Sequence, residues 1–280
     1  MRLLHRTTRS LALTEEGQLL LQTAQPALSI LERALAQVRE GKDEIAGPLR
    51  IVGPKSSFAP ILMPVIDEFC RLHPDVQPDI QLEDGIGNWV LDRVDVGFRL
   101  GAPPEDGLIA RKLFPAQLII CAAPSYLQRN GVPMSLEDLA RHRCTVFRHP
   151  STGQVIPWYV RVKGEIVRRE FAPALSTNDT ELEILAVLAG QAIGQLASMS
   201  VANLVRSSKL IPILIDQTMD HRGVYIYYGN RKSQPRRVRA FIDLATSRMS
   251  DSHTFVLSDK ELAQNAKRGV ASLGKKASRK

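Results

Sequence analysis

The chain has 280 residues, of which 44% are apolar and 5% aromatic, and it carries a net charge of +8 with an isoelectric point near 9.6. This length exceeds what one compact core usually organises, so we expect two domains and exclude a short peptide. The positive charge alone suggests a polyanionic partner. Half of it, however, comes from residues 251–280, where seven basic side chains accompany three acidic ones. The rest of the chain therefore has an ordinary charge.

The cysteines and the N-terminus bear on the cellular compartment. Three widely spaced cysteines argue against a disulfide framework and for a reducing compartment: Cys70, Cys121 and Cys144. The first ten residues become charged after two leucines, so they lack the apolar core of a signal peptide. The uncharged stretch 184–205 is long enough to cross a bilayer, but its glycines and polar side chains favour a helix, a short buried strand and a second helix. We therefore predict a cytoplasmic protein without a membrane span.

The chain opens with two short predicted strands within residues 3–13, joined by a polar turn that points Arg6 and Arg9 outward. Two such strands are too small to fold alone. They should therefore belong to a larger unit.

A long helix is predicted next. Thr14 is a suitable N-cap, and acidic residues follow it where the helix dipole favours them, so a helix is expected from Glu15 to about residue 40, with Pro26 as a kink. Its apolar residues are spaced as in a coiled coil, in alternating steps of three and four: Leu21, Ala24, Leu28, Leu31, Leu35 and Val38. This spacing predicts pairing with a second helix. The alternative is a surface helix docked on its own domain.

After a polar hinge the pattern changes to alternating strands and helices. Residues 49–52 are predicted as a buried strand, residues 58–72 as a helix and residues 94–99 as another strand. Residues 76–82 form a further strand, which Pro78 restricts to a sheet edge or a strand start. This order implies a parallel sheet with right-handed crossovers.

The second half of the chain continues the mixed pattern. Residues 118–122 are expected to begin a change of domain. Further strands are predicted at 145–148, at 158–162, around Leu175 and at 224–228. Ser135 opens a capping box, and residues 177–178 are expected to cap a helix over 179–189. A basic helix is predicted over 235–249. Residues 251–280, rich in Lys, Ala, Ser and Gly, are predicted to be disordered.

Three stretches, taken in order, resemble the LysR-type transcriptional regulators. Residues 2–17 are similar to the family's wing and the start of its linker helix. Residues 47–51, 95–101 and 121–127 match the first part of its effector domain, and residues 178–194 a later part. The last stretch has extra glutamines where the family has a tighter Gly-x-Gly-Ile-Ala pattern.

The resemblance implies an α/β fold with a two-lobed, periplasmic-binding-protein-like effector domain, preceded by a long dimerising linker helix and a remnant of the winged helix-turn-helix. The implied parts are a wing remnant (1–14), the linker helix (15–46), the effector domain (47–250) and a basic disordered tail (251–280). Within the effector domain, lobe I comprises about 47–117 and 222–250, and lobe II about 118–221. Met1 stands where the family has already completed its recognition helix, so this chain is expected to contact DNA only weakly and non-specifically, through Arg6 and Arg9 of the wing.

The resemblance also implies an effector pocket between the lobes, lined by strand ends and helix N-termini. Its expected residues are Lys55, Ser56, Ser57, Arg99, Gly101, Phe147, Thr177 and Asn178. The local sequence pattern leaves other roles open for these residues. The serine, threonine and asparagine side chains would also suit ordinary helix caps. Arg99 could instead be solvated, and Phe147 could belong to the hydrophobic core. Helix N-termini favour anions, so the expected effector is a small carboxylate-bearing molecule.

We therefore predict an N-terminally truncated LysR-type regulator, a homodimer or tetramer, that senses a small-molecule effector and couples it to DNA binding and transcription control. The alternative is a stand-alone solute-type binding protein without DNA-binding activity, which the missing signal peptide and the coiled-coil spacing oppose. We do not expect an enzyme, because no recognisable motif brings together a Ser, a His and an acid. His142 and Cys144 lack a second ligand pair for zinc. No catalytic residue, metal or cofactor is predicted.

Overall fold

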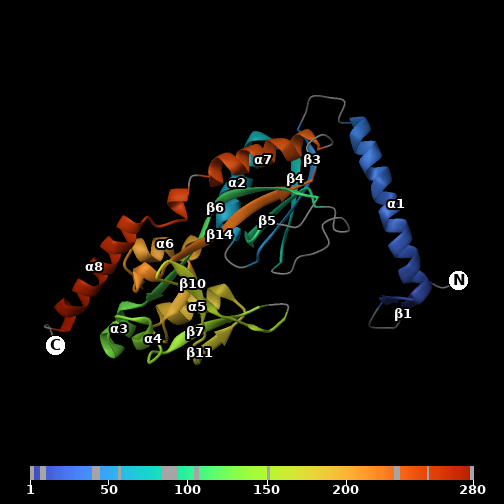
Figure 1. The fold of residues 1–280 in the computed structure, drawn as a ribbon. Helices are drawn as coiled ribbons and strands as arrows, with labels where there is room; N and C mark the ends of the chain where they lie inside the picture. The colour runs from blue at the N-terminus through green and yellow to red at the C-terminus, as the bar shows by residue number, and fades with distance from the viewer. Residues whose placement is uncertain are drawn as a thin grey trace. The chain divides into compact units, whose positions relative to one another are not determined.

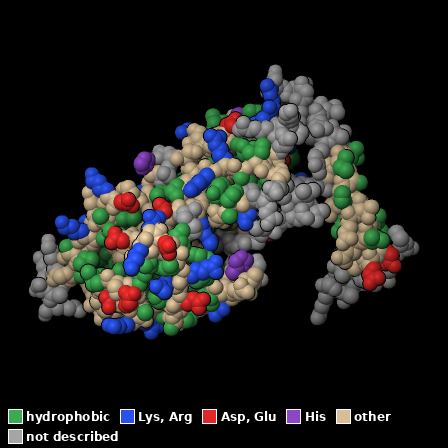
Figure 2. All heavy atoms as spheres, viewed as in Figure 1, with side chains coloured by type: hydrophobic (Ala, Val, Ile, Leu, Met, Phe, Trp, Pro, Cys, Tyr) green, Lys and Arg blue, Asp and Glu red, His purple; other side chains and the backbone are tan. Residues whose placement is uncertain are grey.

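The computed structural model describes residues 3–6, 11–39, 45–55, 58–83, 94–103, 107–149, 152–229, 234–250 and 252–277. The chain divides into two compact units, Met1–Gly47 and Pro48–Lys280 (Figure 1). In the larger unit, Lys and Arg side chains are mixed with Asp and Glu over the face seen in Figure 2. The net positive charge is therefore not gathered into one basic surface on that face.

The smaller unit confirms the predicted order of two strands and a long helix. It contains β1 (Leu4–Arg6), β2 (Leu11–Leu13) and α1 (Glu15–Arg39). The strands pair antiparallel, with Leu4 opposite Leu13. Thr14 caps α1 as predicted, because its Oγ1 accepts a hydrogen bond from the Gly17 N–H at 3.0 Å. The helix continues through Pro26.

The larger unit is built on a seven-stranded sheet with strand order β12-β6-β14-β5-β3-β4, and β13 also pairs with β6. The strands are β3 (Gly47–Gly53), β4 (Val76–Leu82), β5 (Val96–Gly101), β6 (Ile109–Ala122), β12 (Gly194–Ala197), β13 (Ile211–Pro212) and β14 (Met219–Tyr228). The β3 and β5 strands are parallel, as predicted from the strand–helix–strand order.

Helices α2 (Ala59–Leu72) and α7 (Arg236–Met249) pack against each other at one end of this sheet (Figure 1). Their contact is aromatic: the ring centres of Phe69 and Phe241 lie 5.2 Å apart at 80°. Phe98 of β5 faces Phe241 at 6.5 Å and Phe58 at 4.9 Å. Edge-to-face rings of this kind hold the two helices on the sheet.

The other end carries a smaller sheet, in which β7 (Cys144–Arg148) lies between β11 (Pro173–Thr177), parallel to it, and β8 (Val155–Ile156), antiparallel. A two-stranded hairpin is formed by β9 (Trp158–Val162) and β10 (Glu165–Arg169). The surrounding helices are α3 (Pro124–Asn130), α4 (Leu136–Leu139), α5 (Thr180–Leu188), α6 (Ser198–Arg206) and the short η1 (Ile215–Gln217). Ser135 caps α4 as predicted, with its Oγ accepting from the Asp138 N–H at 3.1 Å.

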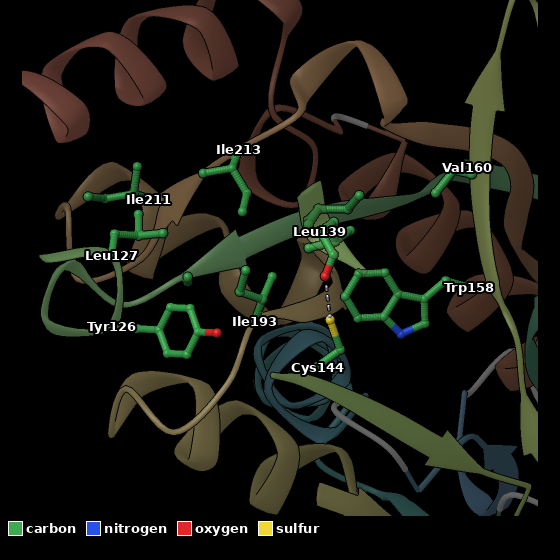
Figure 3. Packing of buried hydrophobic residues seen from close by; sticks show 11 residues of the cluster. Tyr126, Leu127, Leu139, Cys144, Trp158, Val160, Ile193, Ile211 and Ile213 are labelled. Carbon is green, nitrogen blue, oxygen red and sulfur yellow. Dashed lines mark hydrogen bonds between the residues drawn. The ribbon is translucent and has the colours of Figure 1, made fainter. Parts of the chain in front are cut away.

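One hydrophobic cluster joins these elements (Figure 3). Trp158 of β9 lies in it beside Cys144 of β7 and Ile193, and the Trp158 indole N–H donates to the Thr145 carbonyl at 3.1 Å. The start of the hairpin is thereby fixed to the smaller sheet. The uncharged stretch 184–205 forms part of α5, then β12 and α6, as predicted. No helix in the described ranges is both long and apolar enough to cross a membrane.

The predicted disorder of residues 251–280 is wrong for most of this segment. It forms η3 (Ser252–Thr254) and α8 (Asp259–Ala277). Leu257 and Leu262 are buried, and Leu273 packs against the cluster of Figure 3. The residues Leu262, Ala266, Gly269 and Leu273 follow helical spacing, which the basic composition of the segment conceals.

Candidate effector site

The candidate residues of the first part of the unit lie at the ends of two parallel strands. In β3 and β5, Ile51 is opposite Val96, so the two carboxyl ends meet at one edge of the sheet. Lys55 follows β3 and is exposed, and Arg99 and Gly101 end β5. Gly101 has φ +117°, which favours glycine, so the backbone itself restricts this position. Ser56 and Ser57 lie outside the described residues.

Arg99 gives this edge a positive charge. It is half-buried, and within the described part of the chain it has no carboxylate partner. Burial raises the pKa of the neighbouring Tyr227 phenol, while the Arg99 charge acts to lower it. An uncompensated, partly desolvated guanidinium can bind a carboxylate through two parallel hydrogen bonds.

A second pair of parallel strands brings together Phe147 and Thr177. They are direct neighbours at the carboxyl ends of β7 and β11. Phe147 is only half-buried, and Thr177 is buried. An apolar surface and a hydroxyl therefore lie side by side, directly before the start of α5.

The predicted capping of this helix by Thr177 and Asn178 is wrong. Asp179 is the N-cap, and its Oδ1 accepts from the Leu182 N–H at 2.7 Å. Thr177 still belongs to β11, because its pairing with Phe147 continues the strand, and its Oγ1 accepts from the Asp179 N–H at 3.0 Å. Asn178 is exposed, and its side chain has no hydrogen-bond partner among the described residues. Its amide is therefore not used in capping.

The candidate residues thus form two strand-end sets, one at the ends of β3 and β5 and the other at the ends of β7 and β11. Strands β6 and β14 join the two sets. Residues Ile109–Leu118 of β6 pair with β14, and Leu118–Ala122 pair with β12 and β13 on the other edge. The register of β14 against β6 shifts between Met219 and Arg222. Two strands with a local irregularity connect the two parts of the unit, an arrangement that permits hinge motion.

Comparison with known proteins decides between the candidate functions. The LysR substrate binding domain matches residues 42–250. The chain belongs to the LysR-type transcriptional regulators. It is 32% identical over 243 residues to the HTH-type transcriptional regulator PtxR of Pseudomonas aeruginosa, covering 87% of this chain and 77% of that protein. It is similar to the full-length structure of the virulence activator AphB of Vibrio cholerae, with 25% identity and a TM-score of 0.71 over 88% of this chain and 84% of that chain. It is also similar to the structure of CrgA of Neisseria meningitidis, with 28% identity and a TM-score of 0.66 over 89% of this chain and 84% of that chain.

Membership of the LysR family confirms the predicted fold class, a two-lobed, periplasmic-binding-protein-like effector domain. The relatives are transcriptional regulators rather than enzymes, and they do not favour the alternative of a stand-alone solute-binding protein. As a LysR-type regulator, the chain couples an effector-binding domain to the control of transcription.

The structure describes some, but not all, of the predicted linker and wing residues of this LysR-type chain. Leu21, Leu28 and Leu31 are exposed on α1, at 47%, 60% and 57%, and Ala24 is half-buried. Leu35 and Val38 belong to α1, but their side chains lie outside the described residues. Arg6 ends β1 with its side chain likewise outside them, and Arg9 is not described at all.

One buried carboxylic acid close to the candidate site was not predicted from the sequence. Glu183 of α5 is 4% exposed, and the Thr145 hydroxyl donates to its Oε1 at 2.6 Å. Burial raises the pKa of Glu183 to about 7, although the hydrogen bond acts to lower it. Its position four residues after the N-cap, in helical spacing with the buried apolar Ala186 and Val187, was the available signal.

Two of the three cysteines lack the features of reactive thiols. Cys121 and Cys144 are buried, and burial raises the pKa of both, that of Cys144 to about 12. Such thiols stay protonated at neutral pH and bind metals poorly. Within the described ranges, no group of three or more His, Cys, Asp or Glu side chains is placed to hold a metal ion.

Proposed function

We propose that this LysR-type regulator binds a small carboxylate-bearing effector between the two strand-end sets, and that the bound state changes how the homo-oligomer controls transcription from DNA. The observation that carries the proposal is the pairing of parallel strands, which puts Arg99 and Gly101 at one edge and Phe147 and Thr177 at another. Carboxyl ends of parallel strands are where α/β proteins bind ligands. A cytoplasmic location fits this function.

The chemistry of these edges favours an organic acid. Arg99 supplies an unpaired positive charge, Lys55 a second cation, and Phe147 an apolar surface. The Thr177 hydroxyl and the Asn178 amide add hydrogen-bonding groups close to the N-terminus of α5. A carboxylate with a small apolar body would use all of these groups.

Exchange of Arg99 for glutamine tests the proposal. A charge-assisted hydrogen bond contributes about 1.5–3 kcal/mol, so Arg99→Gln should weaken binding of an effector by about tenfold or more. Candidate acids are first selected by thermal shift, since a ligand at 100 times its dissociation constant adds about 2.7 kcal/mol of stability. Titration calorimetry then compares the variants.

The matched control is Arg111→Gln, which removes an exposed arginine from β6 of the same sheet. It should bind the selected acid as the parent does. If Arg99→Gln and Thr177→Val both keep the parent affinity while remaining folded by circular dichroism, the effector binds elsewhere.

We further propose that α1 forms a homo-oligomer by pairing with α1 of a second copy. Its exposed leucines have coiled-coil spacing, and burying them against another helix removes apolar surface from water. Leu31→Asp should therefore abolish cross-linking between cysteines introduced into α1 of two copies, because a buried, unpaired carboxylate is strongly unfavourable. The control is Gln22→Asp, which introduces the same charge at an exposed polar position of the same helix and should leave cross-linking intact. Unchanged cross-linking of the Leu31→Asp variant would refute helix pairing.

A further inference from the structure

A cluster of arginines surrounds one tyrosine where the β9–β10 hairpin meets the start of β14. Tyr159 and Arg168 are direct cross-strand partners in the hairpin. Arg161, two residues after Tyr159 on β9, forms an ion pair with Asp220 of β14 at 2.7 Å. The hairpin and β14 are therefore joined across this cluster.

Two guanidinium groups lie over the same tyrosine ring. The Arg222 Cζ is 4.7 Å from the ring centre of Tyr159, and the Arg168 Cζ is 5.9 Å from it. Both arginines are exposed, and neither has a carboxylate partner in the described part of the chain. The only carboxylate that forms an ion pair in this described cluster, Asp220, pairs with Arg161. Both positive charges thus lie within 5.9 Å of the same ring centre, and in the described part of the chain neither has a counter-charge. An anion at this tyrosine would be attracted by both.

The backbone of Tyr159, the tyrosine that both guanidinium groups contact, is fixed by hydrogen bonds. The Gln195 side chain accepts from the Tyr159 N–H at 3.0 Å and donates to the Tyr159 carbonyl at 2.6 Å. The preceding residue, Trp158, lies in the hydrophobic cluster (Figure 3). Its indole N–H donates to the Thr145 carbonyl, which anchors it there. A fixed backbone at Tyr159 limits the freedom that the residues of this cluster lose on binding a ligand.

We infer that Tyr159, Arg168 and Arg222 form a binding site for a small, multiply charged oxyanion, such as a phosphate group or a dicarboxylate. Guanidinium groups bind such oxygens with paired, charge-assisted hydrogen bonds, and the two unpaired arginines match a charge of about two. None of these residues belongs to the proposed effector set, so the site goes beyond the proposed function. Because Arg222 lies where the register of β14 shifts, a bound anion would tie the hairpin to a strand that connects the two parts of the unit.

Titration of the full chain with inorganic phosphate, at ionic strength held constant with sodium chloride, tests the site. We expect saturable binding by calorimetry and a matching rise in the melting temperature. Arg168→Gln and Arg222→Gln should each weaken binding by about tenfold or more. Arg169→Gln removes the same charge from the next residue of β10 and should have little effect. Arg99→Gln should leave phosphate binding unchanged, which separates this site from the proposed effector site. Repeating the titration with malonate in place of phosphate tests whether the site binds a dicarboxylate or a phosphate group.

A measurement on the unsubstituted chain avoids any folding defect. Phenylglyoxal modifies accessible arginines, and peptide mass spectrometry gives the rate at each position. Phosphate or malonate should slow modification of Arg168 and Arg222 at least fivefold, without slowing that of Arg169. Absence of saturable binding by both anions would overturn the inference, as would equal protection of all three arginines or equal losses in Arg169→Gln and Arg222→Gln.

Discussion

Replacement of Gln117 by leucine is expected to lower the free energy of unfolding of the larger unit by about 3 kcal/mol. Gln117 is a buried residue of β6, and its side-chain amide acts like a peptide group. It donates to the Leu257 carbonyl at 2.8 Å and accepts from the Leu257 N–H at 3.0 Å. Leucine fills a similar volume but leaves both backbone groups buried without a partner. Each such group costs about 1–3 kcal/mol.

The effect should be concentrated in the C-terminal segment. Leu257 lies between Phe255, which stacks on Phe114 at 5.0 Å, and α8. Arg206 of α6 also holds this segment, through the His253 and Thr254 carbonyls and Glu261. Chemical denaturation gives the loss of stability, and amide hydrogen exchange should show faster exchange in α8 than in α2.

The control for this prediction is Gln128→Leu on α3, where the glutamine is exposed and the change should stay within about 0.5 kcal/mol. A similarly small change for Gln117→Leu would contradict the prediction, because it would mean that other groups satisfy the Leu257 backbone.

Local pattern in the sequence was enough for much of the fold. The helix expected from Glu15 is observed at Glu15–Arg39, and the strand expected at 158–162 is observed at Trp158–Val162. Both have strong local signals, a cap followed by heptad-like spacing in one and a β-biased run in the other. The resemblance to LysR-type regulators supplied the two-lobed arrangement, which no local pattern determines.

Other elements depend on contacts that are distant in sequence. The strand β6, which begins at Ile109, was not predicted, and residues 118–122 were expected only to begin a change of domain. Its first four residues are exposed and include Arg111 and Lys112, so the hydrophobic pattern is weak there. Pairing with β14 extends the strand. In α8, burial against the rest of the unit likewise outweighs a basic composition.

In the candidate site, too, some features were predictable from the sequence and others depend on contacts between distant residues. Topology predicts that strand ends meet, and Phe147 and Thr177 are neighbours accordingly. The identity of the cap was missed, since Thr, Asn and Asp are all suitable caps and only the length of β11 selects Asp179. The contact of Arg222 with Tyr159 joins residues far apart in the chain, and no local signal marks it.

Glu183 should make the stability of the larger unit depend on pH. Its pKa is about 7 in the folded chain, against 4.5 as its ordinary value, so the folded state retains a proton that the unfolded state loses between these pH values. The free energy of unfolding should therefore fall as pH rises from about 4.5 to about 7, by about 3 kcal/mol from this group, and then level off. Below pH 4.5 both states are protonated and the group has no effect.

The comparison of the parent with Glu183→Gln isolates this contribution. Glutamine keeps an acceptor for the Thr145 hydroxyl, which now donates to Glu183 Oε1 at 2.6 Å, but it does not ionise. The difference in unfolding free energy between parent and variant, measured by urea denaturation from about pH 4.5 to about pH 8, should change by about 3 kcal/mol in favour of the variant. Glu181→Gln, an exposed position in the same first turn of α5, should give a difference that does not vary with pH over this range. If the Glu183→Gln difference is equally flat, the buried carboxyl is ionised throughout, and a positive group or water must stabilise its charge in the folded state.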